Sequence, residues 1–191
     1  MAVNLPTRKK NRLPLEGYRG RQAYSLTLST HSRRPWFRED AVVQYSLESL
    51  AQTADSCSFS VCAYCFMPDH VHLLVSGETD ESDLVDFVKR FKQSTGWWFL
   101  NQYRAGGLKA SPTPLWQKSY YDHVLRSEED LRAAAEYIVG NPVRAGLASH
   151  IGQYRYAGSL VWPDLVPAAE TKTFAESCRG GLQASRRNAE T

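Results

Sequence analysis

A predicted β-hairpin near the middle of the chain constrains the fold more than any other feature. The segments 58–66 (SFSVCAYCF) and 70–76 (HVHLLVS) are rich in strand-forming residues, and only the three residues MPD separate them. Two strands joined by so short a connection pair as antiparallel neighbours. Because side chains alternate along a strand, Val71, Leu73 and Val75 should face a core while the residues between them face the other side.

The rest of the pattern predicts further strands and helices around this hairpin. Alternating apolar residues indicate a strand, and apolar residues three and four apart indicate an amphipathic helix. The additional predicted elements are strands 22–30 and 120–125 and helices 39–55, 82–103 and 127–140. The order is β-α-β-β-α-β with an added C-terminal helix. This is an α+β, ferredoxin-like pattern, in which a split β-α-β antiparallel sheet is backed by helices.

One folded domain, predicted over residues 22–167, fits the length of 191 residues. Residues 168–191 are small, polar and Gly/Ser-rich, which predicts a flexible tail. Residues 1–21 hold six basic side chains against one acidic one, a local charge of +5. A basic arm of this kind suits a polyanion, and a solvated, disordered arm is the alternative.

No segment is predicted to enter a membrane. The chain has no run near the roughly 18 uninterrupted apolar residues that would span a bilayer. Its first residues are basic and lack the apolar core of a secretory signal. We therefore expect a cytoplasmic protein with no membrane partner.

Two of the five histidines lie one residue apart on the second strand of the hairpin. Residues two apart in a strand project from the same face, with Cα atoms about 6.5–7 Å apart, so His70 and His72 point together. Neutral imidazole is a good ligand for divalent metals, and a strand fixes the separation of the two rings. The spacing predicts two arms of a metal site; partly exposed histidines at a sheet edge are the alternative.

Three cysteines near the hairpin, Cys57, Cys62 and Cys65, raise the alternative of a zinc site completed by a histidine. Cys62 and Cys65 are three residues apart in a predicted strand, so their side chains should face opposite sides of the sheet. We therefore expect buried free thiols rather than zinc ligands or disulfides.

A second candidate pair lies where the last predicted helix ends, in the segment EYIVGNPVRAG. Tyr137 and Asn141 are four residues apart, which places them one above the other on a helix face. The amide oxygen of Asn141 suits a hard cation such as Mg²⁺ or Mn²⁺, and the phenol of Tyr137 becomes a strong nucleophile once deprotonated. The structural alternative is a half-buried Tyr137 and an Asn141 that only caps the helix before Pro142.

These motifs together resemble those of a known family. The segments DHVHLLV and YYDHVLRSEEDLRAAAEYIVGNPVRAGL, in this order and spacing, resemble the single-tyrosine HUH transposases, and most of all the REP-associated tyrosine transposases. The resemblance extends over roughly residues 18–162. It implies the ferredoxin-like fold of HUH endonucleases, which agrees with the fold predicted from periodicity.

The resemblance also implies a role for each candidate residue. His70, His72 and Asn141 would ligate a divalent metal, Mg²⁺ or Mn²⁺, that polarises a DNA phosphate. Tyr137 would attack that phosphate and form a 5′-phosphotyrosine intermediate with a free 3′-hydroxyl. Because this intermediate retains the bond energy, DNA strands could be cut and rejoined without ATP.

Tyr120 and Tyr121 are rival nucleophiles. They are adjacent on a predicted strand, so their side chains should lie on opposite faces. Neither is paired with a ligand at helical spacing, and we therefore prefer Tyr137. His123, on the same strand, is expected to be a strand-face or substrate-side residue rather than a metal ligand.

The substrate implied by the resemblance is palindromic DNA that folds into hairpins, with single-stranded DNA nearby. Basic side chains contact phosphates and aromatic rings stack on unpaired bases, although a solvated surface role is the alternative for each residue. The candidate DNA contacts are Arg33, Arg34, Trp36, Lys89, Arg90, Lys92 and Arg144. We expect a DNA strand transferase that acts as a monomer or homodimer; a catalytically inactive, hairpin-binding regulatory protein is the competing function.

Overall fold

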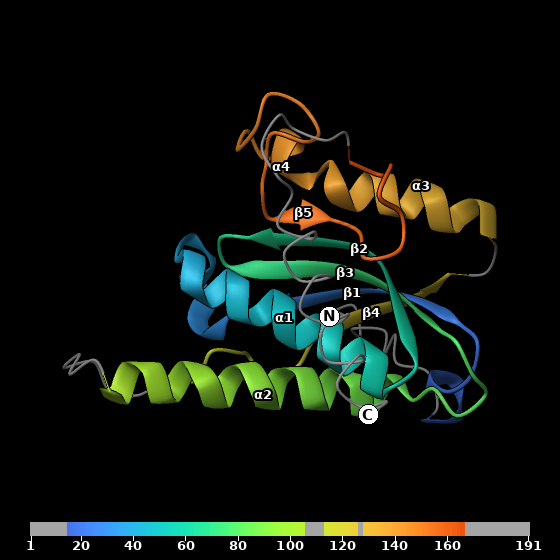
Figure 1. The fold of residues 1–191 in the computed structure, drawn as a ribbon, viewed down its shortest axis with the longest axis horizontal. Helices are drawn as coiled ribbons and strands as arrows, with labels where there is room; N and C mark the ends of the chain where they lie inside the picture. The colour runs from blue at the N-terminus through green and yellow to red at the C-terminus, as the bar shows by residue number, and fades with distance from the viewer. Residues whose placement is uncertain (1–14, 106–112, 126–127, 167–191) are drawn as a thin grey trace, which may run out of the picture.

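An antiparallel sheet with helices on both faces forms the body of the protein (Figure 1). The computed structural model describes residues 15–105, 113–125 and 128–166, and over these residues the sheet has five strands in the order β4-β1-β3-β2-β5. The strands are β1 Ala23–Ser29, β2 Phe59–Met67, β3 His70–Gly77, β4 Tyr121–Leu125 and β5 Ala157–Gly158. The helices are α1 Asp40–Ser56, α2 Leu84–Ala105, α3 Glu128–Val139 and the short α4 Asn141–Arg144, with 3-10 turns at Leu15–Tyr18, His31–Arg33 and Trp36–Arg38.

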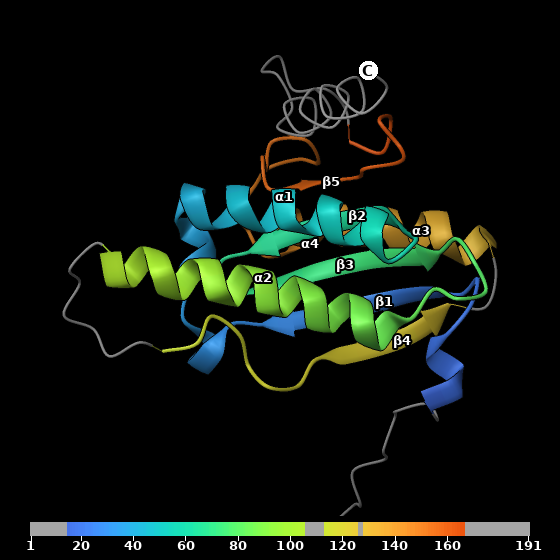
Figure 2. The same ribbon diagram turned by 60° about the horizontal axis from the view of Figure 1, so that its bottom comes forward.

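The predicted ferredoxin-like architecture is confirmed. β3 lies between β1 and β2, β4 extends the sheet beyond β1, and all the pairings are antiparallel. Helices α1 and α2 lie side by side on one face of the sheet, and α3 lies on the other (Figure 2). Each predicted element is present within two residues of its expected bounds, whereas the short β5, which pairs with β2, was not predicted.

The turn between β2 and β3 is tighter than the three residues predicted. Met67 pairs with His70, so only Pro68 and Asp69 connect the two strands. The backbone carbonyl of Asp69 accepts a hydrogen bond from the backbone N–H of Thr30 at 2.9 Å, which ties the turn to the end of β1. Asp69 is thereby held directly beside the first residue of β3.

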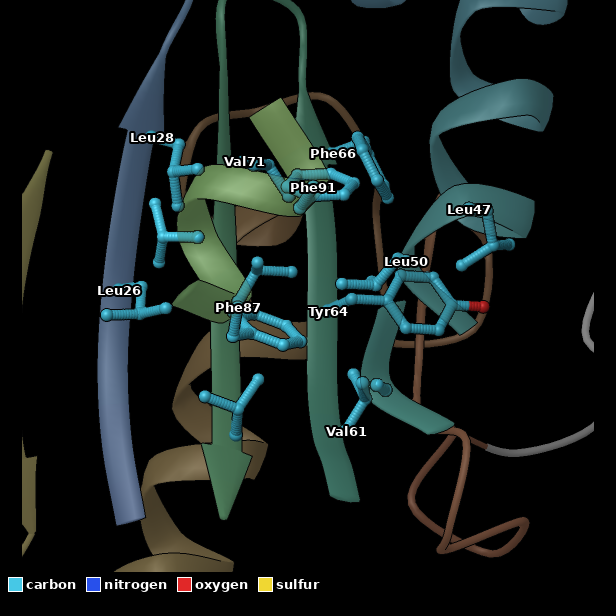
Figure 3. Packing of buried hydrophobic residues seen from close by; sticks show 14 of the residues in the cluster. Leu26, Leu28, Leu47, Leu50, Val61, Tyr64, Phe66, Val71, Phe87 and Phe91 are labelled. Carbon is cyan, nitrogen blue, oxygen red and sulfur yellow. The ribbon is translucent and has the colours of Figure 1, made fainter. Parts of the chain in front are cut away.

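The main core lies between the sheet and helices α1 and α2. Val71, Leu73 and Val75 of β3 are buried in it, as the alternation predicted. Figure 3 shows side chains of β1, β2, α1 and α2 closing around this strand; they are Leu26, Leu28, Val61, Tyr64, Phe66, Leu47, Leu50, Phe87 and Phe91. Each large side chain buried in this way stabilises the fold by about 1.5–3 kcal/mol. Packing therefore occupies this face, and the histidines project from the opposite one.

A smaller core lies on the opposite face, under α3. Ala135, Ile138 and Val139 of α3 are buried there, together with Leu74 of β3. Their spacing of one, three and four residues along α3 is that of one face of a helix. The packing places α3 over the side of the sheet from which the two histidines project.

The cysteines of β2 correct one prediction. Cys62 and Cys65 lie in the same core cluster under α3, so the prediction that they face opposite sides of the sheet is wrong. The register shifts between Val61 and Ala63, and this β-bulge brings Cys62 to the side of Cys65. Both are buried free thiols, and burial is the main cause that raises the pKa of Cys62 to about 11 and that of Cys65 to about 12.

Residues predicted to belong to the N-terminal arm partly join the folded domain instead. Tyr18 is buried, and its hydroxyl donates to Oδ2 of Asp122 at 2.7 Å. The guanidinium Nε of Arg19 donates to Oδ2 of Asp83 at 3.1 Å. Arg21 is also described, and its Nε lies 3.6 Å from Oδ1 of Asp80. The other basic residues of the predicted arm, which are Arg8, Lys9, Lys10 and Arg12, and the predicted tail 168–191 lie outside the described residues. Within the described part of the chain, no helix combines the length and the apolar character needed to cross a bilayer.

Candidate metal and tyrosine site

The two histidine rings of β3 converge on one point. Both side chains are half-buried, and the Nε2 atoms of His70 and His72 are 3.0 Å apart. Their ring centroids are 4.7 Å apart, with the ring planes nearly perpendicular. Two bare nitrogen lone pairs repel at this distance, and a proton or a cation between the two nitrogens would relieve that repulsion. The prediction that the two rings point together is confirmed.

The opposite ring nitrogens are anchored by neighbouring residues. Nδ1 of His70 lies 2.6 Å from Oδ1 of Asp69, and Nδ1 of His72 lies 3.1 Å from the hydroxyl of Thr27. A carboxylate can only accept, so the Asp69 contact places the proton of neutral His70 on Nδ1 and leaves the Nε2 lone pair available. The Thr27 hydroxyl is compatible with the same arrangement in His72. Partners of this kind orient imidazoles that bind metals.

Burial and nearby charges favour the neutral form of His72. The pKa of His72 is lowered to about 4, mainly by burial and further by the positive charges of His70, Arg144 and Arg33. Burial acts to raise the pKa of Asp69, but the hydrogen bonds and charges of His70 and Arg33 outweigh it and lower that pKa. At neutral pH, His72 is therefore uncharged beside an ionised Asp69.

The spacing of the pair fits adjacent positions in an octahedral site. Two ligand atoms at about 2.1 Å from a cation and at right angles are about 3.0 Å apart, which matches the observed Nε2 separation of 3.0 Å. Among the described residues, no cluster of three or more His, Cys, Asp or Glu could hold a metal ion. The further ligands of a cation here would thus be amide, water or phosphate oxygens.

Asn141 supplies an amide at the end of the helix that covers this face. Its Nδ2 donates to the backbone carbonyl of Ile138 at 3.1 Å, and its Oδ1 accepts from the guanidinium of Arg144 at 2.8 Å. The amide therefore does bond to the helix end, as the capping alternative expected. One lone pair of Oδ1 remains for a cation, because an amide oxygen carries two.

Tyr137 lies at the same helix end with its ring open to solvent. The side chain is 63% exposed, which contradicts the alternative of a half-buried tyrosine. The guanidinium carbon of Arg144 lies 3.7 Å from the ring centroid. The helix therefore presents the phenol at the surface, one turn before Asn141, on the side of the sheet that carries the histidines.

The two rival tyrosines differ in their surroundings. Tyr120 packs against the main core, whereas Tyr121 is 57% exposed. Tyr121 pairs with Thr27, which in turn pairs with His72, so the three residues form one row across the sheet. Tyr121 thus shares the face of the histidines, and it is the matched control for any experiment on Tyr137.

Of the predicted DNA contacts that follow β1, the structure brings only some close to the histidine pair. Arg33 donates to Oδ2 of Asp69 at 3.2 Å and so lies beside the histidine pair. The guanidinium of Arg34 lies 6.0 Å from the ring centroid of Trp36. Trp36 is half-buried and makes an edge contact with Phe99, at 5.1 Å between centroids, which leaves it a limited surface for stacking on a base.

The basic residues of α2 are not brought to the candidate site. Lys89, Arg90 and Lys92 lie on the helix that covers the other face of the sheet. Arg90 pairs with Asp86 at 2.6 Å. The ammonium group of Lys92 donates to the backbone carbonyls of the segment 117–118 at 2.6 and 3.0 Å, which is a structural role. DNA contact by these residues stays a prediction.

Sequence reasoning missed the two residues that anchor the imidazoles. Asp69 carries a local signal, since it directly precedes the first histidine and ends a tight turn. Thr27 has no such signal, because it is 45 residues from His72 and only the register of β1 on β3 brings the two together.

Comparison with known proteins identifies the class to which this fold and site belong. The family described as Transposase IS200 like matches residues 20–141, a range that includes both histidines, Tyr137 and Asn141. The chain belongs to this family of transposases.

Named relatives and a solved structure connect it with one branch of that family. A Haemophilus influenzae protein provisionally named a REP-associated tyrosine transposase is 25% identical over 142 residues, which cover 70% of this chain and 77% of the relative. The REP-associated tyrosine transposase of Escherichia coli K12 is 28% identical over 102 residues, covering 52% of this chain and 53% of that protein. The solved structure of a REP-associated tyrosine transposase bound to a REP hairpin has a TM-score of 0.61 and 19% identity, covering 79% of this chain and 82% of the other, and shows the shared fold.

Proposed function

We propose that this protein is a metal-dependent endonuclease and strand transferase for single-stranded DNA that acts on palindromic hairpins through a 5′-phosphotyrosine intermediate. The observation that supports this most is the histidine pair, whose Nε2 atoms are 3.0 Å apart while both Nδ1 atoms are anchored. Two histidines that served only in packing would have no reason to bring their Nε2 atoms so close together. The exposed Tyr137 on the same side of the sheet supplies a nucleophile.

His70, His72 and Asn141 would hold the divalent ion, Mg²⁺ or Mn²⁺, which would polarise the scissile phosphate and stabilise charge on the leaving oxygen. Two imidazoles favour the softer Mn²⁺ over Mg²⁺, so Mn²⁺ should bind more tightly. Anchoring of both rings means that little reorganisation precedes binding.

Tyr137 performs the covalent step in this proposal. Its phenolic oxygen loses a proton to solvent and attacks phosphorus, and the bond from phosphorus to the 3′-oxygen breaks. The leaving oxygen takes up a proton and becomes a free 3′-hydroxyl. Attack of a 3′-hydroxyl on the phosphotyrosine reverses these steps and rejoins DNA without an external energy source.

The DNA substrate is proposed from the relatives and from charge near the site. The solved relative is bound to a REP hairpin, and we extend that substrate class to this chain. Arg33 and Arg144 flank the histidine pair closely enough to lower the pKa of His72, so they can also meet a phosphate. The protein would work as a monomer or as a homodimer.

Formation of a covalent adduct tests the proposal. Labelled hairpin oligonucleotides with single-stranded flanks are incubated with the protein and Mn²⁺, and products are separated on denaturing gels. We expect an adduct that chelator and Tyr137→Phe abolish and that Tyr121→Phe leaves intact. Hairpin binding without any adduct would instead establish the inactive regulatory protein, and an adduct lost only in Tyr121→Phe would reassign the nucleophile.

A further inference from the structure

We propose that Arg144 is a positioning residue that fixes Tyr137 and Asn141 relative to each other through the shape of its guanidinium. This inference rests on the proposed function and deepens it. In the sequence, Arg144 is only one of several basic residues that could contact a phosphate. In the structure, it contacts both of the residues on which the proposed chemistry depends.

The contacts of Arg144 form a clamp at the helix end. One guanidinium nitrogen, Nη2, donates both to the backbone carbonyl of Tyr137 and to Oδ1 of Asn141, the latter at 2.8 Å. The guanidinium group lies over the Tyr137 ring, with 3.7 Å from its carbon to the ring centroid. A flat, forked cation can stack and donate in this way, whereas a lysine ammonium cannot reproduce both.

The backbone leaves room for the clamp at Gly140. A Cβ atom at that position would lie 2.9 Å from Nη1 of Arg144 and 3.2 Å from the carbonyl oxygen of Glu136. The backbone of Gly140 is in the ordinary right-handed helical region, at φ −81° and ψ −6°, so alanine fits there without backbone strain. Gly140→Ala would therefore displace the end of the Arg144 side chain with little other change.

The clamp joins the proposed nucleophile to the proposed metal ligand. Tyr137 is exposed, and apart from Arg144 the ring has no described partner that would hold it in one orientation. Asn141 Oδ1 is directed by the same guanidinium. A misplacement of about 1 Å can slow an enzyme reaction roughly 100-fold, so loss of the clamp should appear in the chemical step.

Single-turnover kinetics separate a clamp from a simple phosphate contact. Adduct formation is measured at saturating hairpin oligonucleotide with Mn²⁺, alongside the dissociation constant of the oligonucleotide. We expect Arg144→Lys and Gly140→Ala each to slow the adduct roughly 100-fold while the dissociation constant stays near the wild-type value. A simple phosphate contact predicts instead that the adduct rate also stays near the wild-type value in both variants, because lysine keeps the charge and Gly140→Ala keeps the arginine.

Arg132 provides the matched control on the same helix. Its guanidinium lies 5.4 Å from the ring centroid of Trp162 and pairs with Glu136 and Asp164, so it is another arginine placed over an aromatic ring. Arg132→Ala should leave the adduct rate unchanged. A wild-type rate in Arg144→Lys or in Gly140→Ala, with the variant folded as judged by thermal unfolding, overturns the clamp.

A second measurement does not depend on activity. The side-chain amide signal of Asn141, assigned by its loss in Asn141→Asp, is followed by NMR in the metal-free protein. It should shift in Arg144→Lys and Gly140→Ala and stay in place in Arg132→Ala; an unmoved signal in the first two overturns the inference. Absence of any adduct in the wild type refutes the proposed function instead, and the amide signal then still decides whether the clamp exists.

Discussion

Replacing Asp69 by asparagine should weaken metal binding although neither proposed histidine ligand is changed. Oδ1 of Asp69 lies 2.6 Å from Nδ1 of His70, and its other oxygen accepts from Arg33 at 3.2 Å. The carboxylate can only accept, and it therefore fixes the proton of His70 on Nδ1. An asparagine amide can present its NH₂ group instead, which would move that proton to Nε2 and block the ligand atom.

The expected loss follows from this contact. Removing such an orienting partner typically weakens metal affinity by about 10- to 100-fold. The Nδ1–Oδ1 distance of 2.6 Å is that of a strong, charge-assisted hydrogen bond, so we expect an effect near the upper end. A 100-fold loss corresponds to about 2.7 kcal/mol of binding free energy.

Titration of the DNA-free protein with Mn²⁺, followed by electron paramagnetic resonance of the free ion, measures this loss directly. Asp80→Asn is the control, because that carboxylate is exposed and its ion pair among the described residues is with Arg21, at 3.6 Å. An unchanged Mn²⁺ dissociation constant in Asp69→Asn would refute the orienting role. An equal loss in Asp80→Asn would show that the effect is one of overall charge.

Other perturbations give clear outcomes in urea unfolding and binding experiments. Gly77→Ala should lower the free energy of unfolding by about 2–3 kcal/mol, since its Cβ would lie 2.1 Å from a backbone carbonyl oxygen; Gly96→Ala, with no atom nearer than 4.0 Å, should raise it by about 0.5–1 kcal/mol. Lys92→Met should lower it by about 1 kcal/mol, because two backbone carbonyls lose their donor, and should leave hairpin affinity unchanged if the residue is structural. With metal removed by a chelator, the free energy of unfolding should fall by about 3 kcal/mol from pH 6.5 to pH 4. In the unfolded chain His72 takes up a proton over this range, whereas in the folded protein its pKa of about 4 keeps it largely neutral. His72→Asn should flatten this dependence, and an equally steep profile in that variant would contradict the assignment.

Local periodicity was enough to predict the fold. The alternation of Val71, Leu73 and Val75 identified the buried face of β3, and the same rule placed the two histidines together on the other face. The four-residue spacing of Tyr137 and Asn141 predicted that they lie on one helix face; in the structure Tyr137 is in the last turn of α3 and Asn141 begins α4, which only Gly140 separates from the end of α3. Each of these features depends on the residue spacing within one strand or one helix, so it can be predicted from the sequence of that segment alone.

Features that depend on two elements, or on an irregular one, escaped the same reasoning. Thr27 reaches His72 only through the register of two strands that are distant in the sequence. A lysine on a helix is normally expected to be a solvated surface charge. The ammonium group of Lys92 instead donates hydrogen bonds to backbone carbonyls of a segment that begins 25 residues away. The face of the sheet on which Cys62 lies depends on a β-bulge, and a rule of strict alternation along a strand does not predict the extra residue of a bulge.

The arrangement also explains why metal binding and nucleophile placement should be separable. The histidines lie on the central strand β3, which is hydrogen-bonded on both sides, and their second nitrogens are anchored from the turn and from β1. Tyr137 lies at an exposed helix end, where Arg144 is its described clamp. Asp69→Asn should therefore lower Mn²⁺ affinity and leave the adduct rate at saturating Mn²⁺ largely intact, whereas Gly140→Ala should slow the adduct even at saturating Mn²⁺. Equal losses of the adduct rate at saturating Mn²⁺ in both variants would mean that the strand and the helix end act as one coupled unit.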